Sequence, residues 1–120
     1  MSEHFSEAEL RCKGIDCGCG KADMDPAFMR LLERVRVAYG RGMILSSAFR
    51  CDDYNFAVGG AKKSAHREGR AVDVVVSAAA AYDLVNVAMY CGMTGIGVSQ
   101  KGENRFIHLD DMPRKAVWSY

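Results

Sequence analysis

The residues with the clearest chemical potential are two histidines and one aspartate. His66 and Asp73 lie seven residues apart in the stretch SAHREGRAVD, and His108 lies in FIHLD near the other end of the chain. Neutral imidazoles are good zinc ligands, and a carboxylate is a common third partner. Two histidines and one carboxylate, with the fourth position open for water, are typical of a catalytic zinc site. The alternative is that His66 and Asp73 form a polar surface pair.

Local sequence signals predict how these three side chains are positioned. Gly69 and the β-branched run that follows it argue against one continuous helix from His66 to Asp73. His66 is therefore expected on a tight loop and Asp73 on the strand RAVDVVV. The segment RFIHLD is expected to be a neighbouring strand that carries His108. A loop and an adjacent strand can converge on one point, so the three side chains can meet.

The order of predicted elements indicates an α+β domain spanning residues 1–120, with a small, mainly antiparallel sheet and packed helices. Asp25 as a cap, followed by Pro26, predicts a helix that runs to about Tyr39. Ser77 is expected to cap a second long helix that ends at Gly92. The other expected elements are a short helical turn at SEAEL, a helical turn near residues 54–58, strands at MILSSAF and GIGVS, and a hairpin turn over residues 101–104.

The composition narrows the classes of function. The chain has 16 Lys and Arg against 15 Asp and Glu, a net charge of +1, which gives no electrostatic case for nucleic acid or an anionic membrane. No apolar run approaches the roughly 20 residues of a membrane helix. The polar, acidic start MSEHFSEAEL contains no visible signal peptide. We therefore expect a monomer that is made in the cytoplasm, does not insert into a membrane, and reaches any external target only by release.

The cysteines form a second group of reactive residues. Cys12, Cys17 and Cys19 lie together in CKGIDCGCG, and the total of five, with no export signal, argues against a complete disulfide framework. These three thiols could form part of a structural zinc site, but no fourth ligand is evident from the sequence. The alternative is a glycine-rich loop with buried or free thiols. A redox or metal-storage module built on the cysteines is thus one possible class of function. The third histidine, His4, is not expected to take part in a site.

The stretch SAHREGRAVD also matches the Ser-x-His-x-x-Gly-x-Ala-x-Asp signature of zinc peptidases of the D-alanyl-D-alanine carboxypeptidase type, the M15 group. This group includes phage endolysins and shares a core with the lysostaphin and hedgehog folds. Upstream, SSAFRCDDYNFAVGGAKKSAH is similar to the family's Ser-Gly-aromatic-Arg stretch with its following Asn and Gly-Gly. FIHLD resembles the second histidine segment, and the ending AVWSY is also typical of the family. The resemblance covers the chain from about Asp25 onward.

The resemblance implies that His66, Asp73 and His108 bind Zn²⁺. It also implies hydrolysis of a peptide bond in the stem peptides or cross-links of bacterial peptidoglycan, by a carboxypeptidase or an endopeptidase such as a phage endolysin. Such an enzyme polarises the scissile carbonyl with zinc and activates water.

Two further residues match positions that face the substrate in this family. Arg50 matches an arginine that can stabilise the developing oxyanion or bind a peptide carboxylate. Its alternative role is a salt bridge to Asp52 or Asp53. Ser64 matches a serine at the substrate edge of the loop, and it could equally hold its own turn by a backbone hydrogen bond.

The general base is where the chain departs from the family pattern. In better-known members this group lies two or three residues before the last histidine ligand, where this chain has Phe106 and Arg105. Asp110 lies on the same strand face as His108, roughly 7 Å along the strand. Asp110 could be the base, or it could hydrogen-bond a ligand imidazole, and Glu103 in the preceding turn is a rival base. The missing acid leaves open a non-catalytic, zinc-containing module that binds the cell wall or belongs to a phage structure.

Overall fold

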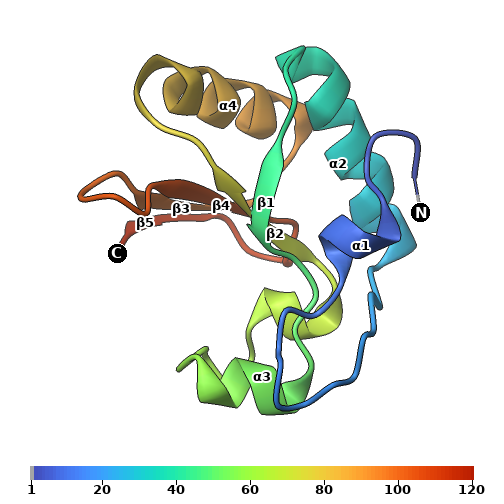
Figure 1. Cartoon of the computed structure of the whole chain (residues 1–120). Coiled ribbons are helices and arrows are strands. Elements are labelled where there is room, and N and C mark those ends of the chain that lie inside the picture. The colour runs from blue at the N-terminus through green and yellow to red at the C-terminus, as the bar shows by residue number, and fades with distance from the viewer. Residues whose placement is uncertain (1) are drawn as a thin grey trace.

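The computed structural model describes residues 2–120, which fold into a five-stranded sheet with helices packed on it (Figure 1). The elements in chain order are α1 (Glu7–Leu10), α2 (Pro26–Tyr39), β1 (Ile44–Ser47), α3 (Asp52–Ala57), the 3-10 helix η1 (Ala65–Glu68), β2 (Ala71–Val75), α4 (Ala78–Cys91), β3 (Gly95–Ser99), β4 (Phe106–Asp110) and β5 (Ala116–Ser119). The strand order across the sheet is β1-β2-β4-β3-β5, and only the β3–β5 pair is parallel. This is the predicted α+β fold with a mainly antiparallel sheet. No helix within residues 2–120 is long and apolar enough to cross a membrane.

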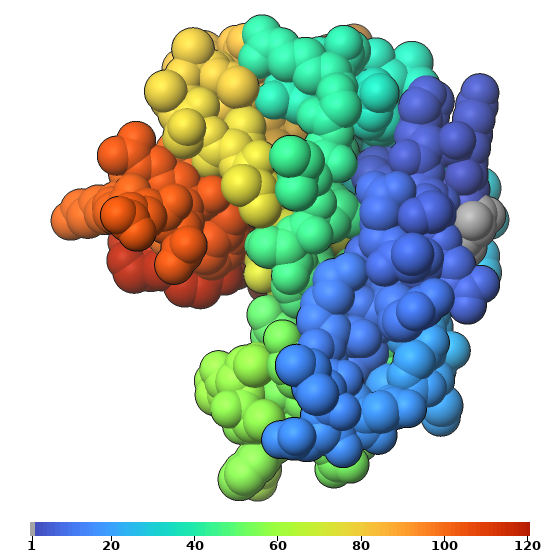
Figure 2. All heavy atoms as spheres, in the orientation of Figure 1, coloured from blue at the N-terminus to red at the C-terminus, as the bar shows by residue number. Residues whose placement is uncertain are grey.

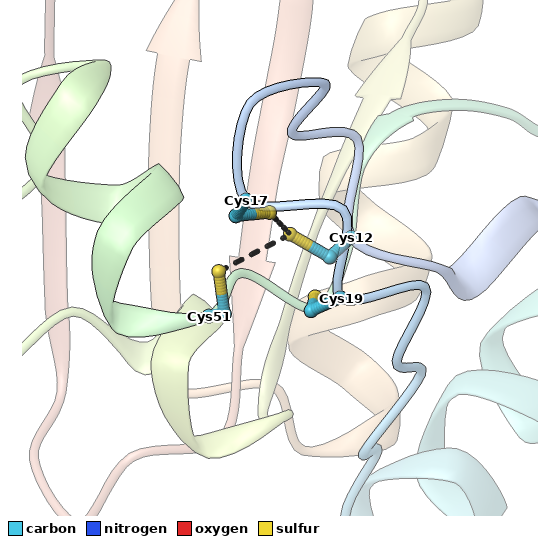
Figure 3. Close-up of side chains that lie close together, drawn as sticks. All are labelled: Cys12, Cys17, Cys19 and Cys51. Atoms are coloured by element: carbon cyan, nitrogen blue, oxygen red, sulfur yellow. Dashed lines mark hydrogen bonds between the residues drawn. The ribbon is translucent and has the colours of Figure 1, made fainter.

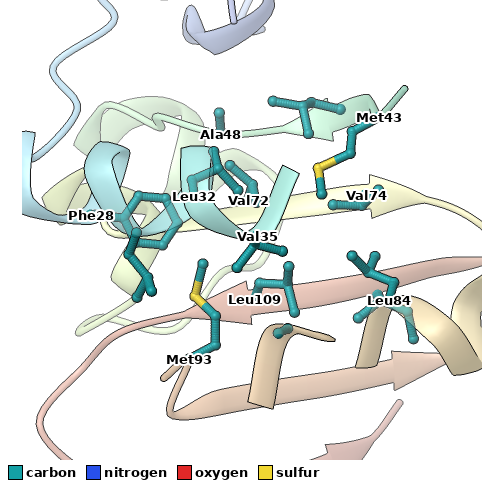
Figure 4. Close-up of a cluster of buried hydrophobic side chains, with 14 of the residues drawn as sticks. Phe28, Leu32, Val35, Met43, Ala48, Val72, Val74, Leu84, Met93 and Leu109 are labelled. Atoms are coloured by element: carbon teal, nitrogen blue, oxygen red, sulfur yellow. The ribbon is translucent and has the colours of Figure 1, made fainter. Parts of the chain in front are cut away.

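Helices α2 and α4 cover one face of the sheet, and the hydrophobic core lies between (Figures 1 and 4). The Asp25 side chain caps α2 by accepting a hydrogen bond from the Phe28 amide at 2.9 Å, and Gly40 ends the helix in the left-handed conformation. These are the start and stop that the sequence predicts. The fully buried side chains of the core include Phe28, Leu32, Val35, Val72, Val74, Leu84, Ile107 and Leu109.

The period of two along each strand separates core residues from site residues. In β2, Val72 and Val74 belong to the core cluster, so Asp73 between them faces the other side of the sheet. In β4, His108 and Asp110 alternate in the same way with the core residues around them. Asp73 and His108 are direct partners in the antiparallel β2–β4 register. Segments η1 and α3 lie on this second side of the sheet, away from α2 and α4 (Figure 1).

Two local features differ from the expectations. Ser77 precedes α4 but makes no side-chain cap, and the side chain of Gln100 accepts the hydrogen bond from the Ala78 amide at 3.3 Å instead. The C-terminal segment AVWSY forms the strand β5, which pairs in parallel with β3. Both features depend on partners more than 15 residues away, so local sequence signals did not predict them.

Candidate metal centre

His66, Asp73 and His108, the three predicted ligands, converge on the side of the sheet away from the core. Asp73 Oδ1 lies 3.2 Å from His66 Nε2 and 3.1 Å from His108 Nδ1. One ligand atom from each residue lies within 4.8 Å of the others, and all three residues are buried. The predicted loop and strands do meet at one point: η1 brings His66, β2 brings Asp73, and β4 brings His108.

The hydrogen bonds behind the two imidazoles select which ring nitrogen faces the centre. His66 Nδ1 lies 2.7 Å from the carbonyl oxygen of Ala48. A carbonyl can only accept, so Nδ1 carries the proton and Nε2 offers a lone pair. His108 Nε2 lies 2.7 Å from Asp110 Oδ2, so His108 Nε2 donates a hydrogen bond to that carboxylate. His108 Nδ1 then carries the lone pair that can bind a metal ion. Two oriented imidazole nitrogens and a carboxylate oxygen therefore fit the ligand set of a divalent transition metal.

The electrostatics of the centre favour a cation. Burial alone would raise the pKa of the Asp73 carboxyl, but the adjacent imidazoles of His108 and His66, when protonated, hold this pKa well below its usual value. Burial alone would lower the pKa of His108, but Asp110 and Asp73 on its two sides raise it. The site thus attracts positive charge, and a proton on Nδ1 of His108 competes with a metal ion for the same lone pair.

Asp110 is fully buried directly behind His108. Its Oδ1 accepts hydrogen bonds from the Met112 amide at 3.1 Å and from Arg114 Nη1 at 2.8 Å. Its Oδ2 accepts from His108 Nε2 and from Arg114 Nη2 at 2.9 Å. Burial alone would raise the pKa of Asp110, but His108, Arg114 and the Met112 amide hold it well below its usual value. Both oxygens of this ionised carboxylate are therefore engaged with protein groups.

Two glycines of β3 leave room for this arrangement. Gly95 pairs with Asp110 and Gly97 pairs with His108 in the β3–β4 register. A Cβ at Gly95 would overlap the carboxylate of Asp110, and one at Gly97 would lie 2.8 Å from Trp118 Nε1. The Trp118 ring lies 5.1 Å from the His108 ring, centroid to centroid. Sequence reasoning missed these residues, although the alternating glycines of GIGVS beside a histidine strand were a usable signal.

An open cleft of about 770 Å³ leads to the metal centre. One wall is the segment around residues 58–65 and the other is the C-terminal part of the chain, and Figure 2 shows the surface hollowed between the green and red regions. Arg50, Lys63, Ser64 and Tyr120 line the cleft. A hollow of this size can admit a short peptide beside the metal ligands.

Arg50 faces the candidate metal centre from the connection between β1 and α3. Its Nη2 lies 3.5 Å from Asp73 Oδ2, and its other nitrogens donate to Ser47 Oγ at 3.1 Å and to Asn55 Oδ1 at 3.3 Å. The alternative of a salt bridge from Arg50 to Asp52 or Asp53 does not form within residues 2–120: the carboxylate nearest to Arg50 is Asp73, and Asp52 pairs with Arg67 at 2.8 Å.

The other two predicted residues lie in different surroundings. The Ser64 hydroxyl accepts a hydrogen bond from the His66 amide at 3.2 Å, so Ser64 holds the turn that carries His66 while also lining the cleft. Glu103 is exposed in the β3–β4 turn and is not among the residues that line the cleft.

Two buried histidines and one buried aspartate at the inner end of an open cleft make up a candidate metal centre, with the kind of ligand set that metallohydrolases use. The chain belongs to the Peptidase M15 family, whose model matches residues 3–110. It is therefore a member of a metallopeptidase family. No curated protein sequence matches the chain.

Proposed function

We propose that this protein is a zinc metallopeptidase that hydrolyses a peptide bond in the stem peptides or cross-links of bacterial peptidoglycan. The observation that carries the proposal is the convergence of His66 Nε2, Asp73 Oδ1 and His108 Nδ1 beside Arg50 in the cleft. A zinc ion bound by these three residues would polarise the scissile carbonyl and activate a water molecule. Membership of the Peptidase M15 family supports the peptidase chemistry.

Arg50 is proposed to bind the substrate. Ser47 and Asn55 hold its guanidinium in one orientation, so little side-chain entropy is lost when a ligand binds. A planar, fixed guanidinium suits either the carbonyl oxygen that gains charge during hydrolysis or a peptide carboxylate. Lys63 adds a second cation to the same cleft, and Ser64 lies at its edge. Stem peptides carry carboxylates, which matches these groups.

Asp110 is proposed to position His108. Its hydrogen bond to Nε2 fixes the imidazole so that Nδ1 faces Asp73. Arg114 binds both oxygens of Asp110 and so fixes the carboxylate in turn. The assignment of the general base to Asp110 or Glu103 stays a prediction, and the variants described in the Discussion test it.

A second candidate function is a non-catalytic, zinc-containing module that binds the cell wall or belongs to a phage structure. One observation favours it. Among the described residues that line the cleft, only Asp73 and Asp110 carry carboxylates, and both are engaged by histidine and arginine. A peptidase needs a group that takes a proton from water and passes it to the leaving amine.

The peptidase function, and a module that binds the wall, both require the protein to reach the cell wall. We propose that the protein is made in the cytoplasm and reaches the wall by release, as phage endolysins do.

Digestion of purified peptidoglycan separates the two functions. The full chain, loaded with Zn²⁺, is incubated with walls of different cross-link chemistry, and the products are identified by mass spectrometry. The peptidase proposal expects new amino termini or shortened stem peptides that are absent with His66→Ala. If the zinc-loaded protein co-sediments with walls but releases no peptide from any of them, the binding module is the correct function.

A further inference from the structure

Four of the five cysteines converge at a second place in the molecule, separate from the candidate metal centre. Cys12 follows α1, Cys17 and Cys19 lie in the loop that leads to α2, and Cys51 directly precedes α3 (Figure 3). Cys12 Sγ lies 3.9 Å from Cys17 Sγ and 3.7 Å from Cys51 Sγ. The four sulfur atoms all lie within 4.8 Å of one another, and all four thiols are free.

These separations match the edges of a zinc–thiolate tetrahedron. A zinc–sulfur bond of about 2.3 Å in tetrahedral geometry places neighbouring sulfur atoms ~3.8 Å apart. The observed 3.7 and 3.9 Å agree with this spacing. They are far longer than the ~2 Å of a disulfide bond. The thiol groups therefore already surround one common point.

The surrounding backbone is shaped to keep the sulfur atoms together. The amide of Tyr54 approaches Cys51 Sγ at 3.4 Å, a contact that favours a thiolate ligand. The Cys12 amide donates to the Lys21 carbonyl at 2.8 Å and closes the loop between them. A Cβ at Gly14 would lie 2.6 Å from Cys17 Sγ and 3.0 Å from the Tyr54 side chain, so only glycine leaves space there.

We propose that Cys12, Cys17, Cys19 and Cys51 bind one structural Zn²⁺ as four thiolates, in addition to the ion of the cleft. Thiolates are soft ligands that select zinc over magnesium or calcium. Four protein ligands complete the tetrahedron and leave no position open for water, so the ion is structural. Binding releases the thiol protons, and zinc undergoes no redox change in the process. The sequence left this site without a fourth ligand, and the fold supplies Cys51.

The site connects the N-terminal segment to the wall of the substrate cleft. Cys51 is adjacent in sequence to Arg50, and it caps α3, whose Asn55 accepts a hydrogen bond from Arg50. Residues 12–19 contain no helix or strand, so a bound ion would crosslink a loop that no regular backbone pairing holds. The four-cysteine ion thus stabilises the loop and the orientation of Arg50 together.

Metal content and cobalt spectra test this inference on the full chain purified under reducing conditions. Elemental analysis should find about two zinc ions per chain, one lost in Cys19→Ser and the other in His108→Ala. Cys91 lies in α4 outside the cluster, so Cys91→Ser is the matched control and should keep both ions. Replacement with Co²⁺ should give a thiolate-to-cobalt charge-transfer band in wild type and in His108→Ala.

The cobalt spectrum of the wild-type protein tests the inference without any variant. The test therefore still holds if the Cys19→Ser protein fails to fold. One zinc per wild-type chain that His108→Ala removes completely, with no charge-transfer band from added Co²⁺, would overturn the four-cysteine site. This result would leave the proposed peptidase function untouched, because that function depends only on the ion in the cleft.

Discussion

Asp110 Oδ2 lies 2.7 Å from Nε2 of His108, two residues earlier on the same face of β4. This hydrogen bond determines which nitrogen of His108 faces Asp73, because the other ring nitrogen must then carry the lone pair. Arg114 donates hydrogen bonds to both oxygens of the same carboxylate. The candidate metal centre is therefore supported by a chain of contacts that runs from Arg114 through Asp110 to His108.

Asp110→Asn distinguishes a positioning residue from a general base. If Asp110 positions His108, zinc affinity should fall about 10- to 100-fold, and excess zinc should restore most of the hydrolysis rate. A zinc titration followed by turnover at saturating zinc measures both effects. Asp111→Asn is the matched control, since Asp111 pairs with Arg70 and does not line the cleft. A rate that stays about 100- to 10,000-fold low at saturating zinc would instead assign the base to Asp110.

Glu103→Gln should leave turnover at the wild-type value. Glu103 is exposed in the turn between β3 and β4, and it does not line the cleft. A general base must come within hydrogen-bond reach of the water that attacks the substrate. Steady-state kinetics on the same peptidoglycan fragment provide the check. An inactive Glu103→Gln protein with normal zinc content would show that the turn closes over the substrate and supplies the base.

Arg50→Lys should keep the metal but lose activity. Lysine retains the charge, but it cannot reproduce the planar contacts of Arg50 with Ser47 and Asn55. Loss of a group that stabilises the oxyanion typically lowers kcat by about 100- to 1,000-fold. Zinc content and kcat are measured for Arg50→Lys beside Arg67→Lys, whose guanidinium pairs with Asp52. Unchanged kcat with a raised KM would assign Arg50 to binding of a substrate carboxylate alone.

Gly95→Ala should destabilise the protein and weaken metal binding together. The added methyl group overlaps the Asp110 carboxylate, which has no space to move because it is fully buried. Overpacking of this kind costs about 1–3 kcal/mol of unfolding free energy. Denaturant unfolding and zinc titration measure the two effects. Gly42→Ala is the control, because a Cβ at Gly42 would meet open space. Equal stability of the two variants would contradict the close packing of β3 against Asp110.

The contact between His4 and Glu33 predicts a pH-dependent term in stability. The Glu33 carboxylate lies 2.6 Å from His4 Nδ1 and accepts hydrogen bonds from the Ser2 hydroxyl and the His4 amide. Burial alone would raise the pKa of Glu33, but these partners lower it below its ordinary value. A lowered pKa stabilises the fold above the unfolded-state pKa, and this stabilisation is lost as pH falls through the folded-state value.

Glu33→Gln should therefore be less stable than wild type at neutral pH, and the difference should shrink as the pH falls through the acidic range. Unfolding curves recorded at neutral and at acidic pH provide the measurement. A difference that stays constant with pH would mean that the carboxylate charge contributes nothing.

The local placement of the candidate metal ligands was predictable from the sequence, and the resemblance to the peptidase family implied the ligand set itself. Alternation along a strand places His108 and Asp110 on one face whatever the strand pairs with. The glycine at position 69 interrupts the segment between His66 and Asp73, so that a 3-10 turn precedes the strand. The helix start at Asp25 and Pro26 also depends on neighbouring residues alone. Short-range backbone preferences determine all of these features.

The tertiary structure alone decided which distant residues meet. Strand register sets Asp73 opposite His108, and a shift of one residue would turn the two side chains to opposite faces. Packing of the N-terminal loop against α3 brings Cys51 to Cys12, 39 residues away, and so completes the four-cysteine cluster. The physical reason is that such contacts form only when the free energy of burial and strand pairing over the whole fold favours them. No local stretch of sequence determines that total free energy.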